Sequence, residues 1–302
     1  MVDTSTQIAS LQLKNPTMLA SGIMDEDAGS IQRIIESGAG AIVTKSIGLE
    51  PREGHPNPTL IELDHGVLNA MGLPNSGITN YGEELKALQR AKIPLIGSIY
   101  GANAQEFTKL SQQMADYGVD AVELNLSCPH VKGYGVEIGC DPNLIKKIVS
   151  QVKTTVDIPV FVKLSPNVTD IVELAKVAEA AKADGIVAIN TVKAMKIDLE
   201  VKMPILANKM GGYSGKAIKP IGVRCVYEIA EHVKIPIIGV GGITTGEDAI
   251  EYFMAGASAV QIGTGVYYRG SDVFKTICHE IEQWMKGHNY KTLAELIGVA
   301  QT

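Results

Sequence analysis

The sequence predicts an α/β protein with the architecture of a (β/α)8 TIM barrel, on two observations. A short run rich in Val, Ile and Ala, followed by a loop and then by an amphipathic stretch of helical length, occurs eight times along the chain. Near-continuous apolar strands are typical of a parallel sheet that is covered on both faces. Eight such units within about 250 residues fit a closed barrel better than an open sheet.

The eight predicted strands all begin and end within short apolar runs. They are Thr17 to Ala20, Ala41 to Lys45, Leu95 to Ser98, Ala121 to Asn125, Val160 to Lys163, Gly185 to Ile189, Ile237 to Val240 and Ala259 to Ile262. Pro94, Pro159 and Pro236 each precede one of these runs, where proline ends a helix and opens a strand. Strands that alternate with helices imply parallel pairing through right-handed crossovers.

The intervening helices are predicted from their apolar spacing and their stop signals. Gln105 to Tyr117 carries apolar residues three and four apart and is followed by Gly118. Ala249 to Ala255 ends in the same way at Gly256. We expect a short hairpin within Met1 to Asn15, at the bottom of the barrel.

One domain over residues 1–302 is predicted, because no Gly/Ser/Pro-rich linker divides the chain. Three strand-to-helix connections are unusually long: Ser46 to Thr79, Leu126 to Cys140 and Asn190 to Lys219. In a barrel these loops rise at the C-terminal face, where barrel active sites lie. The chemistry is therefore expected at that face.

Composition narrows the class of partner. The 27 basic and 33 acidic residues give a net charge of -6, which argues against nucleic-acid binding because that affinity rests on clustered Lys and Arg. The longest apolar runs are far shorter than the roughly 20 residues that span a bilayer, so no membrane association is expected. Four cysteines without C-x-x-C pairing predict no metal site and a reducing, cytoplasmic setting.

Polar residues gather where the predicted strands end. Four different strands end in such segments, which are Thr44-Lys45-Ser46, Asn125 to His130, Lys163-Leu164-Ser165 and Asn190-Thr191. Together they predict a site with two cations, two carboxamides and the Cys128 thiol. A strand-end Lys is usually a surface group and a lone Cys usually a small buried hydrophobe, so the prediction depends on their convergence.

Glycines follow the last two strands, in Gly239 to Thr244 and Ile262 to Gly265. Without side chains, glycines let backbone N–H groups approach a phosphate. One such glycine segment alone would indicate only a tight turn. Two of them, after the adjacent strands seven and eight, match the usual phosphate site of a barrel. A phosphorylated ligand is expected there.

These motifs resemble a known family. Thr44-Lys45-Ser46, Asn69 to Asn75, Asn125 to Pro129, Val162 to Asp170, Asn190-Thr191 and Gly241-Gly242 occur in order and resemble the catalytic subunit of class 1 dihydroorotate dehydrogenases. The stretch Pro204 to Gly215, followed by Ile218-Lys219-Pro220, is most similar to the NAD-linked class 1B, with the fumarate-linked class 1A as the alternative. Class 2 enzymes use serine where this chain has Cys128.

The resemblance implies oxidation of (S)-dihydroorotate to orotate in pyrimidine biosynthesis, with flavin mononucleotide (FMN) as cofactor. The residues that match cofactor-binding positions of the family are Ser21, Lys45, Ser46, Ser98, Asn125, Lys163, Ile189, Gly215, Gly241, Gly242, Gly263 and Thr264. The residues that match substrate-binding positions are Lys45, Asn69, Ala70, Met71, Gly72, Leu73, Asn125, Asn190 and Thr191. A Lys charge suits the substrate carboxylate, and carboxamides suit a pyrimidine's alternating donors and acceptors.

In the implied mechanism Cys128 is the base that takes a proton from C5 while a hydride leaves C6. A thiol can act as a base near neutral pH more readily than a serine hydroxyl can. Gly133, Gly135 and Gly139 suggest that the segment carrying Cys128 closes as a lid, although a rigid loop would also need such turns. The chain departs from the family pattern at His130 and Ser98, where an Asn is common.

The family also implies partners: a second copy in a homodimer, and an iron–sulfur, FAD-containing subunit that relays electrons to NAD within a heterotetramer. This chain has no iron–sulfur cysteine spacing of its own. Three other functions are compatible with the sequence. One is pyrimidine reduction of the dihydropyrimidine dehydrogenase kind, and another is a lyase that uses Lys45 or Lys163 as a Schiff base on a phosphate-binding barrel. The third is a barrel that only binds a ligand or a partner.

Overall fold

The computed structural model describes residues 2–89, 91–126 and 139–301 and contains a closed, eight-stranded parallel barrel. All eight predicted strands form it, which confirms the predicted TIM barrel. Neighbouring strands follow the order β10-β15-β16-β3-β4-β7-β8-β9 around the barrel. The strands are β3 (Thr17–Leu19), β4 (Ala41–Val43), β7 (Leu95–Ile99), β8 (Ala121–Asn125), β9 (Val160–Leu164), β10 (Gly185–Ala188), β15 (Ile237–Val240) and β16 (Ala259–Ile262).

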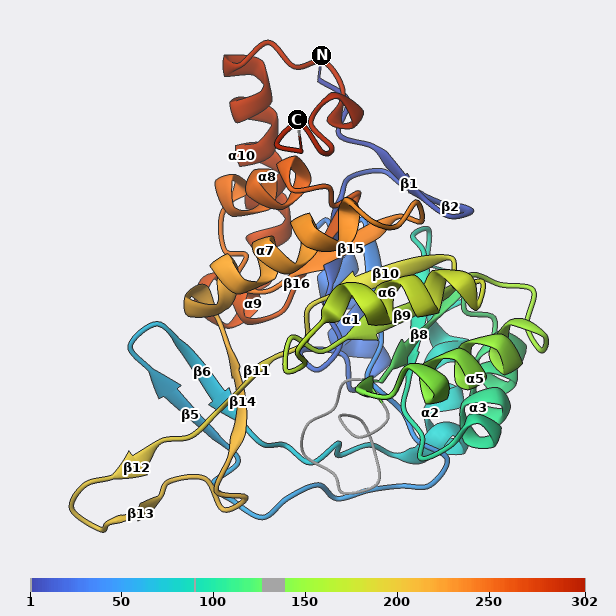
Figure 1. The fold of residues 1–302 in the computed structure, drawn as a ribbon, viewed down its shortest axis with the longest axis vertical. Coiled ribbons are helices and arrows are strands. Elements are labelled where there is room, and N and C mark those ends of the chain that lie inside the picture. Colours follow the sequence, from blue (N-terminus) through green and yellow to red (C-terminus); the bar gives the residue numbers. More distant parts are fainter. Residues whose placement is uncertain (1, 90, 127–138, 302) are drawn as a thin grey trace.

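Helices surround the barrel (Figure 1). Their apolar side chains are buried in one cluster with those of the barrel strands. They are α1 (Ala28–Glu36), α2 (Gly77–Leu88), α3 (Ala104–Asp116), α5 (Pro142–Lys153), α6 (Ile171–Ala180), α7 (Lys219–Ala230), α8 (Gly246–Met254), α9 (Thr264–Arg269) and α10 (Val273–Gly287), with 3-10 turns at Lys216–Ile218 and Leu293–Glu295. Helix α10 and both chain ends lie on one side of the molecule (Figure 1).

Local sequence explains where the predicted helices begin and end. The Asn103 side chain accepts a hydrogen bond from the Glu106 N–H and caps α3, and Thr245 forms a capping box with Asp248 at α8. Gly118 and Gly256 follow these helices with φ of 81° and 114°, the left-handed region that glycine adopts without strain. Both predicted glycine stops are thus confirmed.

The predicted N-terminal hairpin is present as β1 (Thr6–Ile8) and β2 (Leu11–Leu13). Its side chains Ile8, Leu11 and Leu13 are buried in the same apolar cluster as residues inside the barrel, among them Phe161 and Ile238. The hairpin therefore closes the N-terminal end of the barrel, and the opposite end is left for the site.

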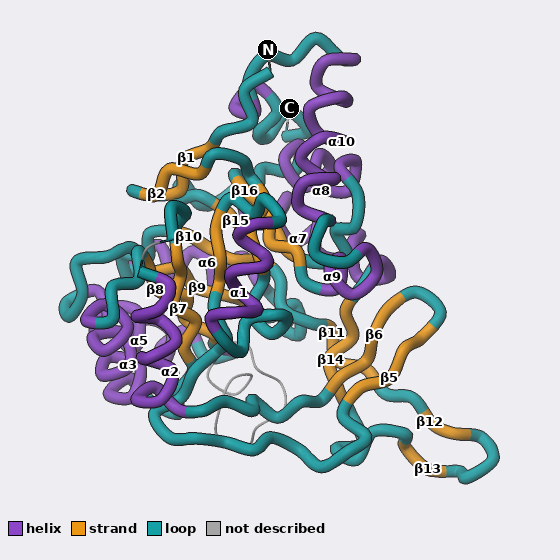
Figure 2. The backbone as a smooth tube through the Cα atoms, turned by 180° about the vertical axis from the view of Figure 1, so that it is seen from behind, coloured by secondary structure: helices purple, strands orange, loops and turns teal. Residues whose placement is uncertain are grey.

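Two of the long connections contain strands that the sequence did not predict. The antiparallel sheet β11-β14-β6-β5 joins the loop after β4 to the loop after β10, and a smaller pair projects beyond it (Figure 2). Its members are β5 (Leu60–Leu63), β6 (Gly66–Asn69), β11 (Val192–Ala194) and β14 (Gly211–Ser214), and the smaller pair is β12 (Ile197–Asp198) and β13 (Met203–Pro204). These strands are too short for a clear alternating pattern. The pairing of β6 with β14 also joins segments that are far apart in the sequence.

Candidate active site

A cavity of about 360 Å³ opens at the C-terminal ends of the barrel strands. Residues one or two positions after β3, β4, β10, β15 and β16 line it, and so does Asn125, the last residue of β8. Lys163 within β9 lines it as well. The two long connections add a wall, which includes Asn69 and Met71 from the first loop and Ser214 from the second. The volume lies within the roughly 300–1,000 Å³ that is usual for small-molecule sites.

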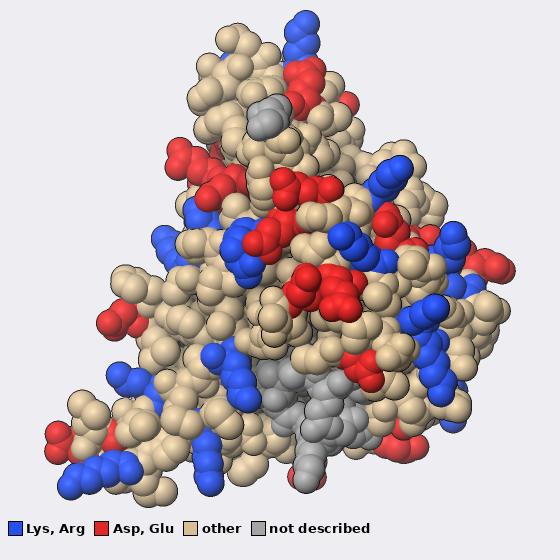
Figure 3. Space-filling model, in the orientation of Figure 1, with Lys and Arg blue, Asp and Glu red and all other residues tan. Residues whose placement is uncertain are grey.

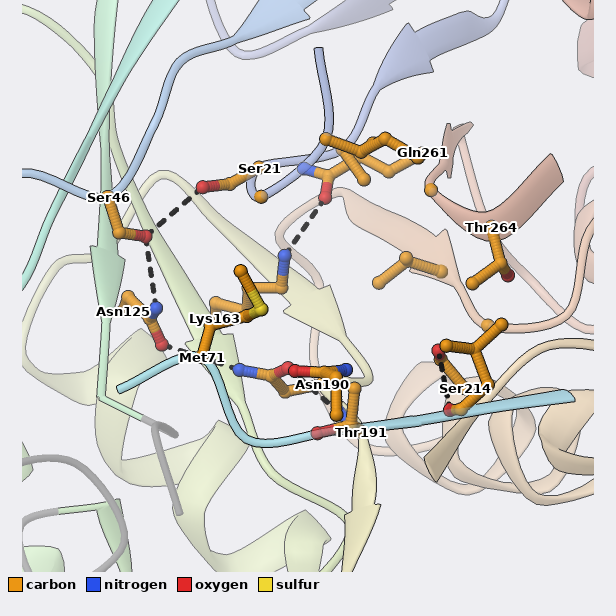
Figure 4. A pocket seen from close by; sticks show the side chains of 18 of the residues that line it. Ser21, Ser46, Met71, Asn125, Lys163, Asn190, Thr191, Ser214, Gln261 and Thr264 are labelled. Atoms are coloured by element: carbon orange, nitrogen blue, oxygen red, sulfur yellow. Dashed lines mark hydrogen bonds between the residues drawn. The ribbon is translucent and has the colours of Figure 1, made fainter. Parts of the chain in front are cut away.

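Serine and asparagine side chains form a continuous network on one side of the cavity (Figure 4). The Ser46 hydroxyl lies 3.1 Å from Ser21 Oγ and 2.8 Å from Ser98 Oγ, and it accepts a hydrogen bond of 3.1 Å from Asn125 Nδ2. Asn190 Nδ2 donates to Asn125 Oδ1 at 3.5 Å. These bonds fix the carboxamides of two strands that are not neighbours, so the site has a preset pattern of donors and acceptors.

Lys45 brings a positive charge to the cavity from the end of β4. Its Nζ lies 3.0 Å from Glu26 Oε1, and Glu26 also lines the cavity. Asp25 lies fully buried beside this pair. Burial raises the pKa of the Asp25 carboxyl to about 6, although the charge of Lys45 acts in the opposite direction.

A second lysine, Lys163 of β9, enters the cavity from inside the barrel. Its Nζ donates to Gln261 Oε1 at 3.3 Å (Figure 4). The same Nζ lies 3.4 Å from Glu123 Oε1. Gln261 Nε2 in turn donates to Glu123 Oε2 at 2.6 Å. The ammonium is therefore held by a carboxylate and a carboxamide that are themselves hydrogen-bonded.

The glycine turns after β15 and β16 form the other side of the cavity, near Ser214 and Thr264 (Figure 4). Gly241 and Gly242 have φ of 135° and 69°. A Cβ at Gly242 would lie 2.7 Å from the Gly215 carbonyl oxygen and 2.8 Å from Lys219 Cβ. Only glycine fits there without a shift of its neighbours, and its backbone is left open to a ligand.

Most of the predicted site residues come together in this cavity. Those that line it are Ser21, Lys45, Ser46, Asn69, Met71, Gly72, Leu73, Asn125, Lys163, Ile189, Asn190, Thr191, Gly241, Gly242, Gly263 and Thr264. Three other predicted site residues do not line the cavity and pack against residues near it. Ser98 is buried against Ser46, Ala70 is buried and donates its N–H to the Thr59 carbonyl, and the carbonyl of Gly215 backs Gly242.

The predicted base Cys128 lies outside the described residues, as do His130 and the glycines at 133 and 135. Asn125, three residues before Cys128 in the sequence, lines the cavity. Gly139 precedes α5, and a Cβ on it would lie 2.1 Å from the Leu126 carbonyl oxygen.

Several residues of the site were not predicted from the sequence. Glu123 and Gln261 are polar residues within otherwise apolar strands, which is a signal that could have identified them. Three other residues carry no such signal. Glu26 lies in an irregular segment, Ser214 ends the short strand β14, and Tyr267 lies in the short helix α9.

Within residues 2–89, 91–126 and 139–301, no group of three His, Cys, Asp or Glu side chains is placed to hold a metal ion. No helix of the same ranges has both the length and the apolar character needed to cross a bilayer. On the face drawn in Figure 3, basic and acidic side chains are interspersed.

Comparisons with known proteins agree with this geometry. The family model "Dihydroorotate dehydrogenase" matches residues 3–285. Three similar proteins are each called "Dihydroorotate dehydrogenase B (NAD(+)), catalytic subunit". The protein of Methanocaldococcus jannaschii is 55% identical over 299 residues, 98% of this chain and 97% of that protein. Those of Thermoplasma acidophilum and Pyrococcus abyssi are 52% and 51% identical, over 99% and 96% of both chains. This chain therefore belongs to the dihydroorotate dehydrogenase family.

Proposed function

We propose that this chain is the catalytic subunit of an NAD-linked dihydroorotate dehydrogenase, which oxidises (S)-dihydroorotate to orotate in pyrimidine biosynthesis. The observation that carries the proposal is one cavity lined by Lys45, three Asn side chains and two glycine turns. Relatives about 50% identical over nearly the whole chain have names that state this activity. The cofactor is FMN, and the setting is the cytoplasm.

The residues of the cavity fit FMN. The glycine turns and Thr264 offer backbone N–H groups and a hydroxyl without an intruding side chain, as a phosphate requires. Ser21, Ser46 and Asn125 offer polar atoms on the other side, and Lys163 offers a buried positive charge. When bound, FMN would supply the group that accepts the hydride leaving C6 of the substrate.

The chain's own groups supply binding and proton transfer. Lys45 and the backbone around Gly72 suit the substrate carboxylate, while Asn69, Asn125 and Asn190 suit the pyrimidine edge. Cys128 takes the C5 proton. Lys163 places positive charge at the inner wall, which favours negative charge on a reduced cofactor. We assign the passage of electrons to NAD to an iron–sulfur, FAD-containing partner subunit, and we expect a homodimer of this chain in the resulting heterotetramer.

The test is to purify the chain with and without its partner subunit and to assay orotate formation with NAD, fumarate or a quinone as acceptor. We expect a yellow protein that binds FMN, and NAD reduction only when the partner is present. A colourless protein that forms no orotate with any acceptor would refute the proposal. Dihydrouracil as a better substrate, or a borohydride-trapped lysine adduct with a carbonyl substrate, would favour the two other enzyme classes.

A further inference from the structure

Three polar side chains meet inside the barrel beneath the cavity. Glu123 of β8 and Gln261 of β16 are 0% and 1% exposed, and Lys163 of β9 is 5% exposed. The interiors of such barrels are usually packed with branched apolar side chains. The apolar cluster that fills the rest of this interior, with Phe161 and Ile238 among its members, has that character. The polar group therefore needs a physical explanation.

The position of the group follows from the register of the strands. Asn125 pairs with Lys163 and Glu123 pairs with Phe161 between β8 and β9. Lys163 is thus one inward-facing position nearer to the mouth than Phe161. Because β8 and β16 lie on opposite sides of the barrel, the bond between Glu123 and Gln261 crosses its interior.

The donor and the acceptor of each hydrogen bond among these three side chains are fixed by their chemistry. An ammonium can only donate and a carboxylate can only accept. Gln261 must therefore present its oxygen to Lys163, at 3.3 Å, and its nitrogen to Glu123, at 2.6 Å. The other carboxylate oxygen of Glu123 lies 3.4 Å from Lys163 Nζ and has no hydrogen-bond partner among the described residues. The Gln261 carboxamide fixes the position of the Lys163 ammonium, and the Glu123 carboxylate balances the charge of that ammonium.

Stability alone does not account for this arrangement. Buried ion pairs are often no more stabilising than apolar residues of the same volume. Here, however, Lys163 and its partner Gln261 both line the cavity, and Glu123 lies behind them. Its charge therefore acts on any ligand that covers Lys163.

We propose that Glu123 and Gln261 are positioning residues that hold the Lys163 ammonium at the inner wall and set the net charge presented to a bound flavin. The inference rests on the proposed function only in taking FMN as the ligand. With Glu123 ionised, the charges of Glu123 and Lys163 nearly cancel. Without it, the unopposed positive charge favours the reduced flavin, which carries more negative charge.

The test is the reduction potential of FMN in the holoenzyme, measured by dye equilibration at fixed pH. Glu123→Gln keeps the shape and removes the negative charge. We expect it to increase the equilibrium constant for two-electron reduction about tenfold, which corresponds to a potential about 30 mV more positive. A potential equal to the wild-type value, or a more negative one, would overturn the proposal.

A charge-relocation variant separates electrostatics from structural damage. Glu123→Gln combined with Gln261→Glu moves the carboxylate to position 261, whose side chain also contacts Lys163, and restores the net charge. Its reduction equilibrium constant is expected within about threefold of wild type. If the double variant keeps the whole shift of the single variant, the proposal is wrong. If Glu123→Gln does not fold, rescue of folding and FMN binding by Gln261→Glu supports the proposal, and the lack of rescue refutes it.

A matched control removes another lysine–carboxylate pair. Asp184 Oδ2 lies 2.7 Å from Lys153 Nζ, and neither residue lines the cavity. Asp184→Asn should leave the potential unchanged, and a shift equal to that of Glu123→Gln would contradict a specific role for Glu123. Wild-type protein that binds no FMN would instead refute the proposed function, so the two failures are distinguishable.

Discussion

At the scale of single residues, the assigned chemistry depends most on Cys128. We expect Cys128→Ala to retain FMN and to lower the rate of flavin reduction by dihydroorotate by a factor of about 10² to 10⁴, the usual contribution of a general base. Anaerobic stopped-flow absorbance of the flavin measures this rate. Cys140→Ala is the control, because Cys140 is exposed and does not line the cavity. A Cys128→Ala variant that is as fast as wild type would exclude the thiol as the base.

Asp25 gives a prediction about pH and stability. Its folded-state pKa is raised from 3.8 to about 6 by burial. The folded protein therefore holds this proton more tightly than the unfolded chain, and the stability due to Asp25 falls as pH rises from about 4 to above 6. The loss amounts to about 3 kcal/mol at neutral pH. Asp25→Asn should gain free energy of unfolding relative to wild type between pH 4 and pH 8, as measured by urea denaturation.

The control for this prediction is Asp27→Asn. Hydrogen bonds from Ser30 lower the pKa of Asp27, which is exposed, so its substitution should show the opposite sign of pH dependence. An Asp25→Asn variant whose advantage over wild type is the same at both pH values would contradict the assigned burial effect.

At the scale of elements, the small sheet β11-β14-β6-β5 positions the substrate side of the cavity. Gly212 of β14 pairs with Asn69 at the end of β6, and Asn69 Nδ2 donates to the Gly212 carbonyl at 3.4 Å. A Cβ at the neighbouring Gly211 would lie 2.4 Å from the Asn69 carbonyl oxygen. The distance between these strands therefore depends on glycine at position 211, and so does the place of Asn69.

We expect Gly211→Ala to raise the KM for dihydroorotate about tenfold, a loss of about 1.4 kcal/mol of binding, with little change in the Kd for FMN. The reason is that separation of β14 from β6 displaces Asn69 and leaves the glycine turns after β15 and β16 in place. Steady-state kinetics and fluorescence titration with FMN measure the two constants. Gly287→Ala is the control, because no atom lies within 4 Å of a Cβ there. An unchanged KM for Gly211→Ala would show that the small sheet does not position Asn69.

The barrel strands could be predicted from the sequence, whereas the strands of the small sheet could not. The barrel strands are buried apolar runs, so each one could be identified from its own residues. Strand β14 could not, since Gly211 and Gly212 have no strand propensity and are held in place by β6, about 145 residues away in the sequence. The lysines and asparagines at strand ends were predictable because the barrel brings all those ends to one face. Glu123 and Gln261 meet across the barrel, and only the closed structure shows that contact.

At the scale of the whole molecule, the C-terminal ends of most barrel strands surround the cavity. Residues that follow β3, β4, β10, β15 and β16 line it, and so does the last residue of β8, Asn125. A ligand that contacts these strand ends binds the folded barrel and has no comparable site on the unfolded chain. Binding must therefore raise the free energy of unfolding by an amount set by the ligand's concentration relative to its Kd.

The last prediction follows from this linkage. FMN at 100 times its Kd should stabilise the apoprotein by about 2.7 kcal/mol, a rise in Tm of about 5 °C for a chain of this size. Differential scanning fluorimetry with a dye that does not overlap flavin emission measures it. Riboflavin at the same concentration lacks the phosphate and should give a smaller rise, because the glycine turns and Thr264 lose their ligand group. Equal shifts for the two compounds would show that the phosphate does not bind at these turns, whereas a shift with neither would remove FMN from the proposed function.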